Sequence, residues 1–282
     1  MSQIRYINHV TGKDVEEYTG SVDKPFKTIS YALTRSADGD ELQLVDMSMV
    51  ADGVYHEDTT LTIERRNNLT IRFGTIAKNG KLSGMKWETV AIKITGCNNI
   101  RIMGVIFICD NEEQNGCVEI SESKDIEIYS CEVDSFKINN PVEKLFRIIR
   151  SSATLTNVAV KEVSTENLEE TDVSPCLTFI DTAGGSTTNI YSCSIQDYSS
   201  EKASLVALHA DHDTRTLNVN GFLVHNCEST TEEGSVGIKI EANAGSFINF
   251  DIRNAQFSNI RTGFLVTNLP PAKKQVSLRI AN

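Results

Sequence analysis

The hexapeptide Ile102-Met103-Gly104-Val105-Ile106-Phe107 recurs along the chain as a pattern of apolar, variable, small or Asn, apolar, variable and apolar residues. Further copies occupy residues 128–133, 155–160, 190–195, 219–224 and 252–257. The small or Asn position recurs after 26, 27, 35, 29 and 33 residues, which gives a period of about 30. Alternating apolar residues are typical of short strands with one buried face, and strands repeating at this period predict a solenoid.

A second series of apolar, variable, apolar triplets has the same period. Its members are residues 92–94, 118–120, 146–148, 177–179, 206–208, 238–240 and 264–266. No helical periodicity separates the two series, so the chain is predicted to be all-β, a parallel β-helix whose coils stack at about 4.8 Å. Equivalent residues of successive coils then form columns along the stack.

Two such columns follow from the hexapeptide. The third residues are predicted to lie at a bend, because small and Asx residues tolerate a left-handed backbone. This column comprises Gly104, Ser130, Asn157, Ser192, Gly221 and Asn254. The next column points inward and comprises Val105, Cys131, Val158, Cys193, Phe222 and Ala255. Its two cysteines are therefore interpreted as small, inert core residues that lie two coils apart, beyond disulfide reach.

The ends of a solenoid need covering, because terminal coils expose backbone groups and core. Residues 25–36 predict an amphipathic capping helix with Pro25 at its start, followed by the turn Asp38-Gly39-Asp40. We expect an N-terminal arm over 1–23 and one β-helix domain over 24–282, with coils over about 42–282. Residues 275–280 predict a final strand with no cap after it, so we expect other structural proteins to contact the C-terminal end.

The segments 25–29 (Pro-Phe-Lys-Thr-Ile), 32–33 (Ala-Leu), 38–40 (Asp-Gly-Asp) and 53–57 (Gly-Val-Tyr-His-Glu), followed by repeated coils, carry a family resemblance. The chain resembles single-stranded right-handed parallel β-helix proteins of the pectin-lyase-like superfamily, closest in character to bacteriophage tailspike or decoration proteins. The resemblance covers nearly the whole chain. It implies the fold but no single activity, because the superfamily includes lyases, hydrolases, esterases, epimerases and tailspikes.

Residues 53–57 also resemble the first motif of pectin methylesterases, but no downstream segment supplies the two aspartates and the arginine that those enzymes need. The signatures of polygalacturonases and pectate lyases are absent as well. The alternative interpretation of 53–57 is structural, a glycine turn with Tyr55 packed under the first coil.

Composition excludes several classes of function. The chain has 27 Lys and Arg against 38 Asp and Glu, a formal net charge of −11, which argues against a nucleic-acid partner. No apolar run reaches the ~18 residues of a membrane helix, and the first residues lack the apolar region of a classical secretion signal. Seven cysteines without a C-x-x-C pair fit a reduced compartment. We expect no cofactor and no resident metal.

One cluster of titratable residues follows the second series of strands. We predict catalytic roles for His209, Asp211, Asp213 and Glu241, with Glu241 placed beside His209 one coil on and Asp181 one coil back. Carboxylates beside a histidine serve as acid–base groups or hold a divalent cation. The alternative for the same residues is an ordinary solvated turn.

A further column, formed by the residues that face outward just before the bend, comprises Arg101, Glu127, Thr154, Asn189, Asn218 and Asp251. Its two carboxylates would lie four coils, about 19 Å, apart, which is too far for paired acid–base chemistry on a glycoside. The apolar residues Ile106, Ala159 and Leu223 also share one outward column, which is a candidate subunit contact.

Two functions of different classes remain open. The first is a structural or binding protein of a virion-type assembly, such as a phage tail spike, baseplate or capsid decoration. It would be a homotrimer, located in the virion or in the cytoplasm before assembly, with a glycan-contacting surface. The alternative is a polysaccharide hydrolase, lyase or epimerase. Trp87 is the single tryptophan, which argues mildly against a long sugar-stacking groove.

Overall fold

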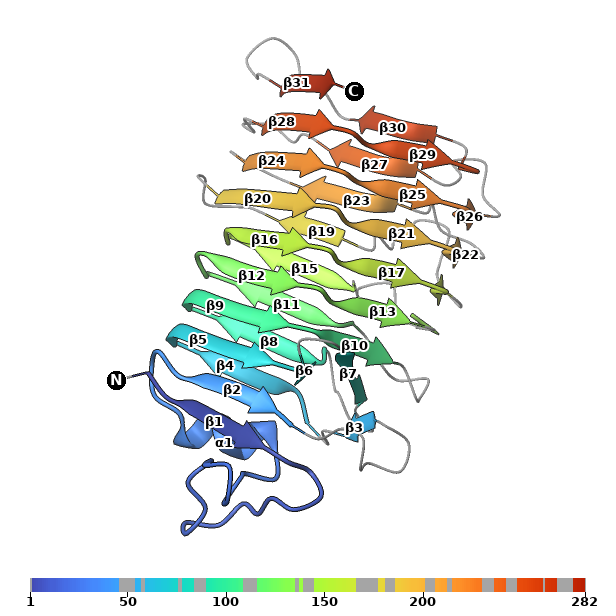
Figure 1. Ribbon diagram of the computed structural model, residues 1–282. Helices are drawn as coiled ribbons and strands as arrows, with labels where there is room; N and C mark the ends of the chain where they lie inside the picture. The colour runs from blue at the N-terminus through green and yellow to red at the C-terminus, as the bar shows by residue number, and fades with distance from the viewer. Residues whose placement is uncertain are drawn as a thin grey trace.

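A computed structural model describes residues 2–45, 54–56, 59–75, 78–83, 90–108, 116–134, 137–138, 145–165, 177–180, 186–200, 206–211, 215–229, 236–241, 248–260, 262–267 and 276–281. Strands stacked one above another run through the length of the molecule, from β1 near the N-terminus to β31 at the C-terminus (Figure 1). No helix in these segments is long and apolar enough to cross a membrane.

Ten strands form the first sheet, and every neighbouring pair in it is parallel. In spatial order they are β1 (Ile4–Ile7), β2 (Glu41–Leu44), β5 (Asn67–Arg72), β9 (Asn98–Met103), β12 (Ile126–Tyr129), β16 (Ala153–Thr156), β20 (Ser186–Tyr191), β24 (Arg215–Asn220), β28 (Ile248–Arg253) and β31 (Val276–Ala281).

The second and third sheets have the same parallel order. The second contains β3 (Val54–His56), β7 (Lys78–Ser83), β10 (Val105–Ile108), β13 (Glu132–Asp134), β17 (Ala159–Lys161), β21 (Ser194–Gln196), β25 (Leu223–His225) and β29 (Gln256–Ser258), with β6 (Gly74–Thr75) antiparallel to β7. The third contains β4 (Leu61–Glu64), β8 (Ile92–Thr95), β11 (Val118–Ser121), β15 (Phe146–Ile149), β19 (Leu177–Ile180), β23 (Val206–Asp211), β27 (Val236–Glu241) and β30 (Thr262–Thr267).

A small fourth sheet joins two-residue strands of four successive coils: β14 (Lys137–Ile138), β18 (Ser164–Thr165), β22 (Ser199–Ser200) and β26 (Glu228–Ser229). From β2 to β30 each coil therefore contributes one strand to each main sheet, while β1 and β31 extend the first sheet alone. This is a parallel β-helix, and the predicted fold class is confirmed.

The bend between the first and second sheets has the predicted backbone. All six residues of the bend column have positive φ: Gly104 (71°), Ser130 (51°), Asn157 (53°), Ser192 (52°), Gly221 (70°) and Asn254 (51°). The column after it is interior, because Val105, Cys131, Val158, Cys193 and Phe222 are at most 3% exposed and Ala255 packs against the core. Left-handed residues turn the chain, and the next side chain then points into the core.

The N-terminal cap is shorter than predicted. Helix α1 spans Ile29–Arg35 and begins at Thr28, whose side chain accepts the Tyr31 N–H, so Pro25 lies outside the helix. Pro25 instead precedes Phe26, which forms a bridge to Ile7 of β1 and is fully buried. The helix begins at Thr28 because the Thr28 hydroxyl accepts a hydrogen bond from the Tyr31 amide, which would otherwise lack a partner.

Tyr55 connects this cap to the first coils. Its ring is buried, and its hydroxyl accepts the N–H of Ile29, the first residue of α1, at 2.8 Å. The structural interpretation of the 53–57 segment is therefore confirmed at Tyr55. Residues Ile4–Ile7, within the segment predicted as an arm, form β1 and extend the first sheet beyond β2.

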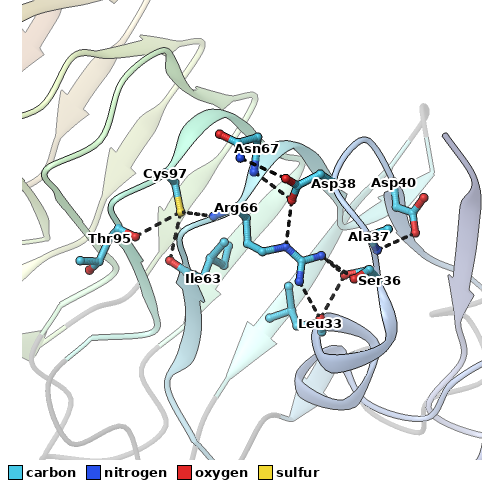
Figure 2. Close-up of polar contacts among 10 residues, drawn as sticks. All are labelled: Leu33, Ser36, Ala37, Asp38, Asp40, Ile63, Arg66, Asn67, Thr95 and Cys97. Carbon is cyan, nitrogen blue, oxygen red and sulfur yellow. Dashed lines mark hydrogen bonds and ion pairs between the residues drawn. The ribbon is translucent and has the colours of Figure 1, made fainter. Parts of the chain in front are cut away.

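Arg66 links the C-terminal end of α1 to the coil that contains β4 and β5 (Figure 2). Its guanidinium donates to the carbonyl of Leu33 at 3.4 Å and to the carbonyl and hydroxyl of Ser36 at 2.7 and 2.8 Å. It also forms an ion pair with Asp38 at 3.3 Å. The last carbonyls of a helix have no partner within the helix, so this arginine supplies one.

A buried polar column continues from Arg66 at the turn from the third sheet to the first. The Arg66 N–H donates to Cys97 Sγ, the Cys97 N–H to Ser123 Oγ, and the Ser123 N–H to Ser151 Oγ. Ser123 and Ser151 are each 1% exposed, and their hydroxyls donate to carbonyls two residues earlier. The interior therefore contains polar groups, but each of these has its hydrogen bonds inside the protein.

Candidate functional site

The described members of the predicted catalytic cluster lie in two neighbouring strands of the third sheet. His209 and Asp211 belong to β23 and Glu241 belongs to β27, while Asp213 and Asp181 lie outside the described residues. His209 is paired with Lys239, and Asp211 is paired with Glu241. The prediction that Glu241 lies beside His209 is therefore wrong.

The error is a register shift of two residues. Leu177 pairs with Leu208, whereas the sequence series aligned Leu177 with Val206. Leu208 then pairs with Ile238, which is buried. A shift of one residue would exchange the buried and exposed faces of the strand. A shift of two leaves both faces unchanged, so the hydrophobic pattern cannot distinguish the two registers.

The corrected register brings two carboxylate-bearing positions together. Asp211 and Glu241 occupy directly opposite positions of neighbouring parallel strands, which lie about 4.8 Å apart. On the preceding coil the residue paired with Asp211 is Ile180, and the residue paired with His209 is Thr178. The backbone therefore places one acid pair, with the histidine two positions before it on β23.

The outward column of the first sheet has the predicted members. Register pairs join Arg101 to Glu127, then to Thr154, Asn189, Asn218 and Asp251 in turn. The side-chain amide of Asn218 donates to Asn189 Oδ1 at 2.8 Å, and that of Asn189 donates to Thr154 Oγ1 at 3.1 Å. These bonds fix the planes of the two amides along the stack.

A groove lies beside this column, where β20, β24 and β28 end. Its volume is about 330 Å³, and its lining includes Tyr191, Asn218, Asn220, Asp251 and Arg253. Tyr191 is 38% exposed, and among the residues whose burial the structure describes it is the one exposed Phe, Tyr or Trp. The groove combines an aromatic ring with amide, carboxylate and guanidinium groups, the usual composition of a site for a polar ligand.

The charged groups of the groove are paired with each other. The Arg253 guanidinium donates from Nε to Asp251 Oδ1 at 3.0 Å and from a terminal nitrogen to Asp251 Oδ2 at 2.7 Å. These hydrogen bonds, with the charge of Asp251, raise the pKa of Arg253. Further down the column Arg101 forms an ion pair with Glu127. The positions between these two pairs, Thr154, Asn189 and Asn218, are uncharged.

Sequence reasoning identified the outward column but not the groove. Tyr191, Asn220 and Arg253 occupy the second, variable position of the hexapeptide, and the register stacks them on successive coils. The signal was available as a second outward column, whose members are Met103, Tyr129, Thr156, Tyr191, Asn220 and Arg253.

A larger hollow of about 410 Å³ lies between α1 and β4. Its lining includes Ser30, Thr34, Thr60, Glu64 and Arg66. Arg66 is already engaged by the end of α1, so its charge serves the cap. Among the described residues, no group of three His, Cys, Asp or Glu side chains is arranged to hold a metal ion.

Two further predicted features are settled by burial and register. Cys131 and Cys193 are buried, which confirms their core placement, and burial raises the pKa of Cys131 to about 12 and that of Cys193 to about 11, which favours inert thiols. Ile106, Ala159 and Leu223 share one column as predicted. However, Glu132 and Ser194 lie between them, so the column is not a continuous apolar stripe.

No protein-family model matches this chain, and no curated protein matches it significantly. Among solved structures it is similar to endo-xylogalacturonan hydrolase from Aspergillus tubingensis, with 13% identity over 85% of this chain and 80% of that chain and a TM-score of 0.35. A rhamnogalacturonan lyase is 11% identical over 89% of this chain and 74% of that chain, with a TM-score of 0.37.

An alginate lyase from Paenibacillus sp. str. FPU-7 is 8% identical over 90% of this chain and 96% of that chain, with a TM-score of 0.28. Such low identities and TM-scores assign neither an activity nor a substrate to this protein. Its own strand pairing defines what it is at the level of architecture, a parallel β-helix with a short N-terminal helical cap.

Proposed function

We propose that the protein binds a polysaccharide on the outer face of the first sheet. The observation that carries this proposal is the exposed Tyr191 ring in a groove lined by amide and charged side chains. Aromatic rings offer sugars a flat apolar surface with little loss of conformational freedom. Amide side chains offer donors and acceptors together, which suits hydroxyl groups on adjacent sugar carbons.

Tyr191→Ala tests the proposal, with Tyr6→Ala as its matched control. Tyr6 lies in the same outward column as Tyr191 but at the N-terminal end of the sheet, on β1. Binding is screened on a panel of plant, microbial and animal polysaccharides and then measured by calorimetry. Loss of the ring is expected to weaken binding about tenfold, equivalent to about 1.4 kcal/mol, while Tyr6→Ala binds as the unmodified protein does.

Binding by no polysaccharide of the panel contradicts the proposal, and so does equal affinity of the unmodified protein and Tyr191→Ala. Circular dichroism and thermal unfolding of both variants separate a lost contact from a lost fold. Asn218→Ala is a second variant in the same groove, and it is expected to weaken binding in the same direction.

Glycoside cleavage is a second candidate, because the register places Asp211 opposite Glu241. Retaining glycosidases use two carboxyl groups about 5 Å apart, one as nucleophile and one as acid–base group, and neighbouring strands have about this spacing. His209 stays in this candidate as an acid–base or positioning group, and Asp213, outside the described residues, stays a prediction from the sequence. The site lies at the ends of β23 and β27 in the third sheet, whereas the Tyr191 groove lies on the first sheet.

Cleavage is tested by release of reducing ends from the same polysaccharides. Asp211→Asn and Glu241→Gln are each expected to abolish cleavage. Lys239→Gln, on the same strand as Glu241, is expected to retain it. Release that persists in both carboxylate variants, or no release from any substrate, removes this candidate and leaves the binding proposal intact.

A further inference from the structure

We infer that the polysaccharide is a neutral linear chain that lies along the solenoid axis and places one sugar on each coil from β16 to β28. This inference rests on the proposed function and specifies its ligand. It is carried by three properties of the outer face of β16, β20, β24 and β28, which we call the groove face. These are the direction in which its polar side chains repeat, the distance between its two outward columns, and the distribution of its charges.

The repeat runs along the axis. Thr154, Asn189, Asn218 and Asp251 are register partners on four successive coils, about 4.8 Å apart. That spacing is close to the length that one pyranose unit adds to an extended chain. A polymer lying along the axis therefore meets a polar side chain at each step, whereas one lying along a strand leaves the column after one sugar.

The hydrogen bonds within the column orient its groups before any ligand arrives. Asn189 and Asn218 each donate one amide N–H to the preceding coil. An amide nitrogen carries two N–H groups and its oxygen two lone pairs, so one donated bond does not exhaust the capacity of either side chain. Preorganised groups bind at a lower entropic cost than groups that must first be ordered.

A parallel column forms the other side of the face. Thr156, Tyr191, Asn220 and Arg253 lie two residues further along the same strands. Two residues of a strand span about 6.6 Å, which leaves room for one sugar ring between the columns. Tyr191 then supplies the aromatic contact, and the 38% exposure of its side chain makes the ring accessible.

Charge selects against an anionic polymer. Between β16 and β24 both columns are uncharged, and at β28 the Arg253 charge is compensated by two hydrogen bonds to Asp251. At the other end Arg101 is paired with Glu127. The whole chain carries a formal charge of −11, so a polyuronate would be repelled and would meet no uncompensated cation in the described groove.

The test uses cello-, xylo- and manno-oligosaccharides of two to six units as neutral probes and oligogalacturonides of the same lengths as anionic probes. Calorimetry is expected to show affinity for at least one neutral series that rises about tenfold or more from two to four units and then levels off. Oligogalacturonides are expected to bind at least tenfold more weakly than the neutral series at equal length.

Asn189→Ala removes one rung of the column, and Asn98→Ala is the matched control. Asn98 is an exposed asparagine of the same sheet at the start of β9, away from the groove. Asn189→Ala is expected to reduce affinity for the tetrasaccharide about tenfold and for the disaccharide by less than twofold. Asn98→Ala is expected to change neither, and thermal unfolding checks that both variants are folded.

The outcomes separate this inference from the proposed function. Equal affinity for two-unit and six-unit probes, or stronger binding of oligogalacturonides, overturns the axial neutral polymer while carbohydrate binding stands. Equal loss of di- and tetrasaccharide binding in Asn189→Ala overturns the rung-by-rung arrangement in the same way. Absence of binding by every probe, neutral and anionic, overturns both.

Discussion

At the residue scale, the left-handed bend shows how one backbone requirement is met by different side chains. Glycine, serine and asparagine alternate in the column at φ between 51° and 71°. Asn and Gly adopt this conformation at low cost, whereas β-branched residues do so rarely. The same column shows where space is available, because a Cβ at Gly221 would come no closer than 3.5 Å to Ser192.

Gly221→Asn is therefore expected to keep nearly the full free energy of unfolding, within about 0.5 kcal/mol, because Asn already occupies the equivalent positions 157 and 254. Gly221→Val is expected to lose about 1–2 kcal/mol, since its branched Cβ disfavours positive φ. Urea unfolding followed by circular dichroism measures both. Equal stability of the two variants would show that this backbone angle does not matter.

Asp40 is a second residue with a defined electrostatic role. Burial of its carboxylate opposes ionisation, but the Ala37 N–H, the Arg5 guanidinium and the Gln3 N–H together outweigh it and lower the pKa. A carboxyl group with a lowered folded-state pKa stabilises the protein above its unfolded pKa of about 3.9. That stabilisation is lost as the pH falls through the lower, folded-state value.

Asp40→Asn is accordingly expected to lower the free energy of unfolding by about 1–3 kcal/mol at pH 7, because the carboxylate bonds to Arg5 and to two backbone amides are lost or weakened. The difference from the unmodified protein should shrink steadily below about pH 4. Denaturant titrations at pH 7, 5 and 3 measure it. A difference that stays constant across this range would exclude the ionised carboxylate as its source.

At the scale of elements, the cap and the first coils are joined by side chains that reach from one to the other. Thr28 begins α1, Tyr55 bonds its first amide, and Arg66 bonds the carbonyls at its end. A helix of seven residues is too short to be stable alone, so its stability comes from these contacts and from its buried apolar residues.

Arg66→Met is expected to lower the free energy of unfolding by about 1.5–3 kcal/mol, because the side chain keeps an unbranched apolar stem but loses the charged bonds to Leu33 and Ser36. The rate of amide hydrogen exchange should increase most in α1, since that helix loses its contact to the coil. Arg65→Met, at the exposed neighbouring position, serves as the control. Equal effects of the two substitutions would argue against a specific joint.

At the scale of the whole molecule, the hydrophobic core extends along the stack of coils, and the described cysteines lie at several levels of it. Cys97, Cys117, Cys131, Cys193 and Cys227 are all buried and free, on five different coils. Burial raises the pKa of Cys97, and it raises that of Cys227 to about 11, so thiolate is scarce at these sites near neutral pH.

Thiol titration of the native protein at pH 8 should therefore detect at most two fast-reacting cysteines, since five of the seven are buried. All seven should react in denaturant, where burial no longer protects them. The measurement is a reaction with a chromogenic disulfide under both conditions. Three or more fast thiols in the native protein would mean that at least one coil of the described core opens readily.

The sequence by itself determined the period, the bend and the inside of the molecule. Each of these depends on local chemistry: alternation fixes which residues face the core, and small or Asx residues mark where the chain turns left-handed. Cys131 could be placed in the interior on the same grounds, and Tyr55 by the structural interpretation of residues 53–57. What alternation cannot specify is the register between coils, because every shift of two residues preserves the same buried face.

Only the tertiary structure decided the features that depend on exact register or on contacts between distant residues. It paired Glu241 with Asp211 instead of His209, and it moved the start of α1 to Thr28. It also brought Tyr191 and Arg253, from coils two apart, into one groove. These arrangements arise from packing and hydrogen bonds between coils, which a one-dimensional pattern of apolar and polar residues does not encode.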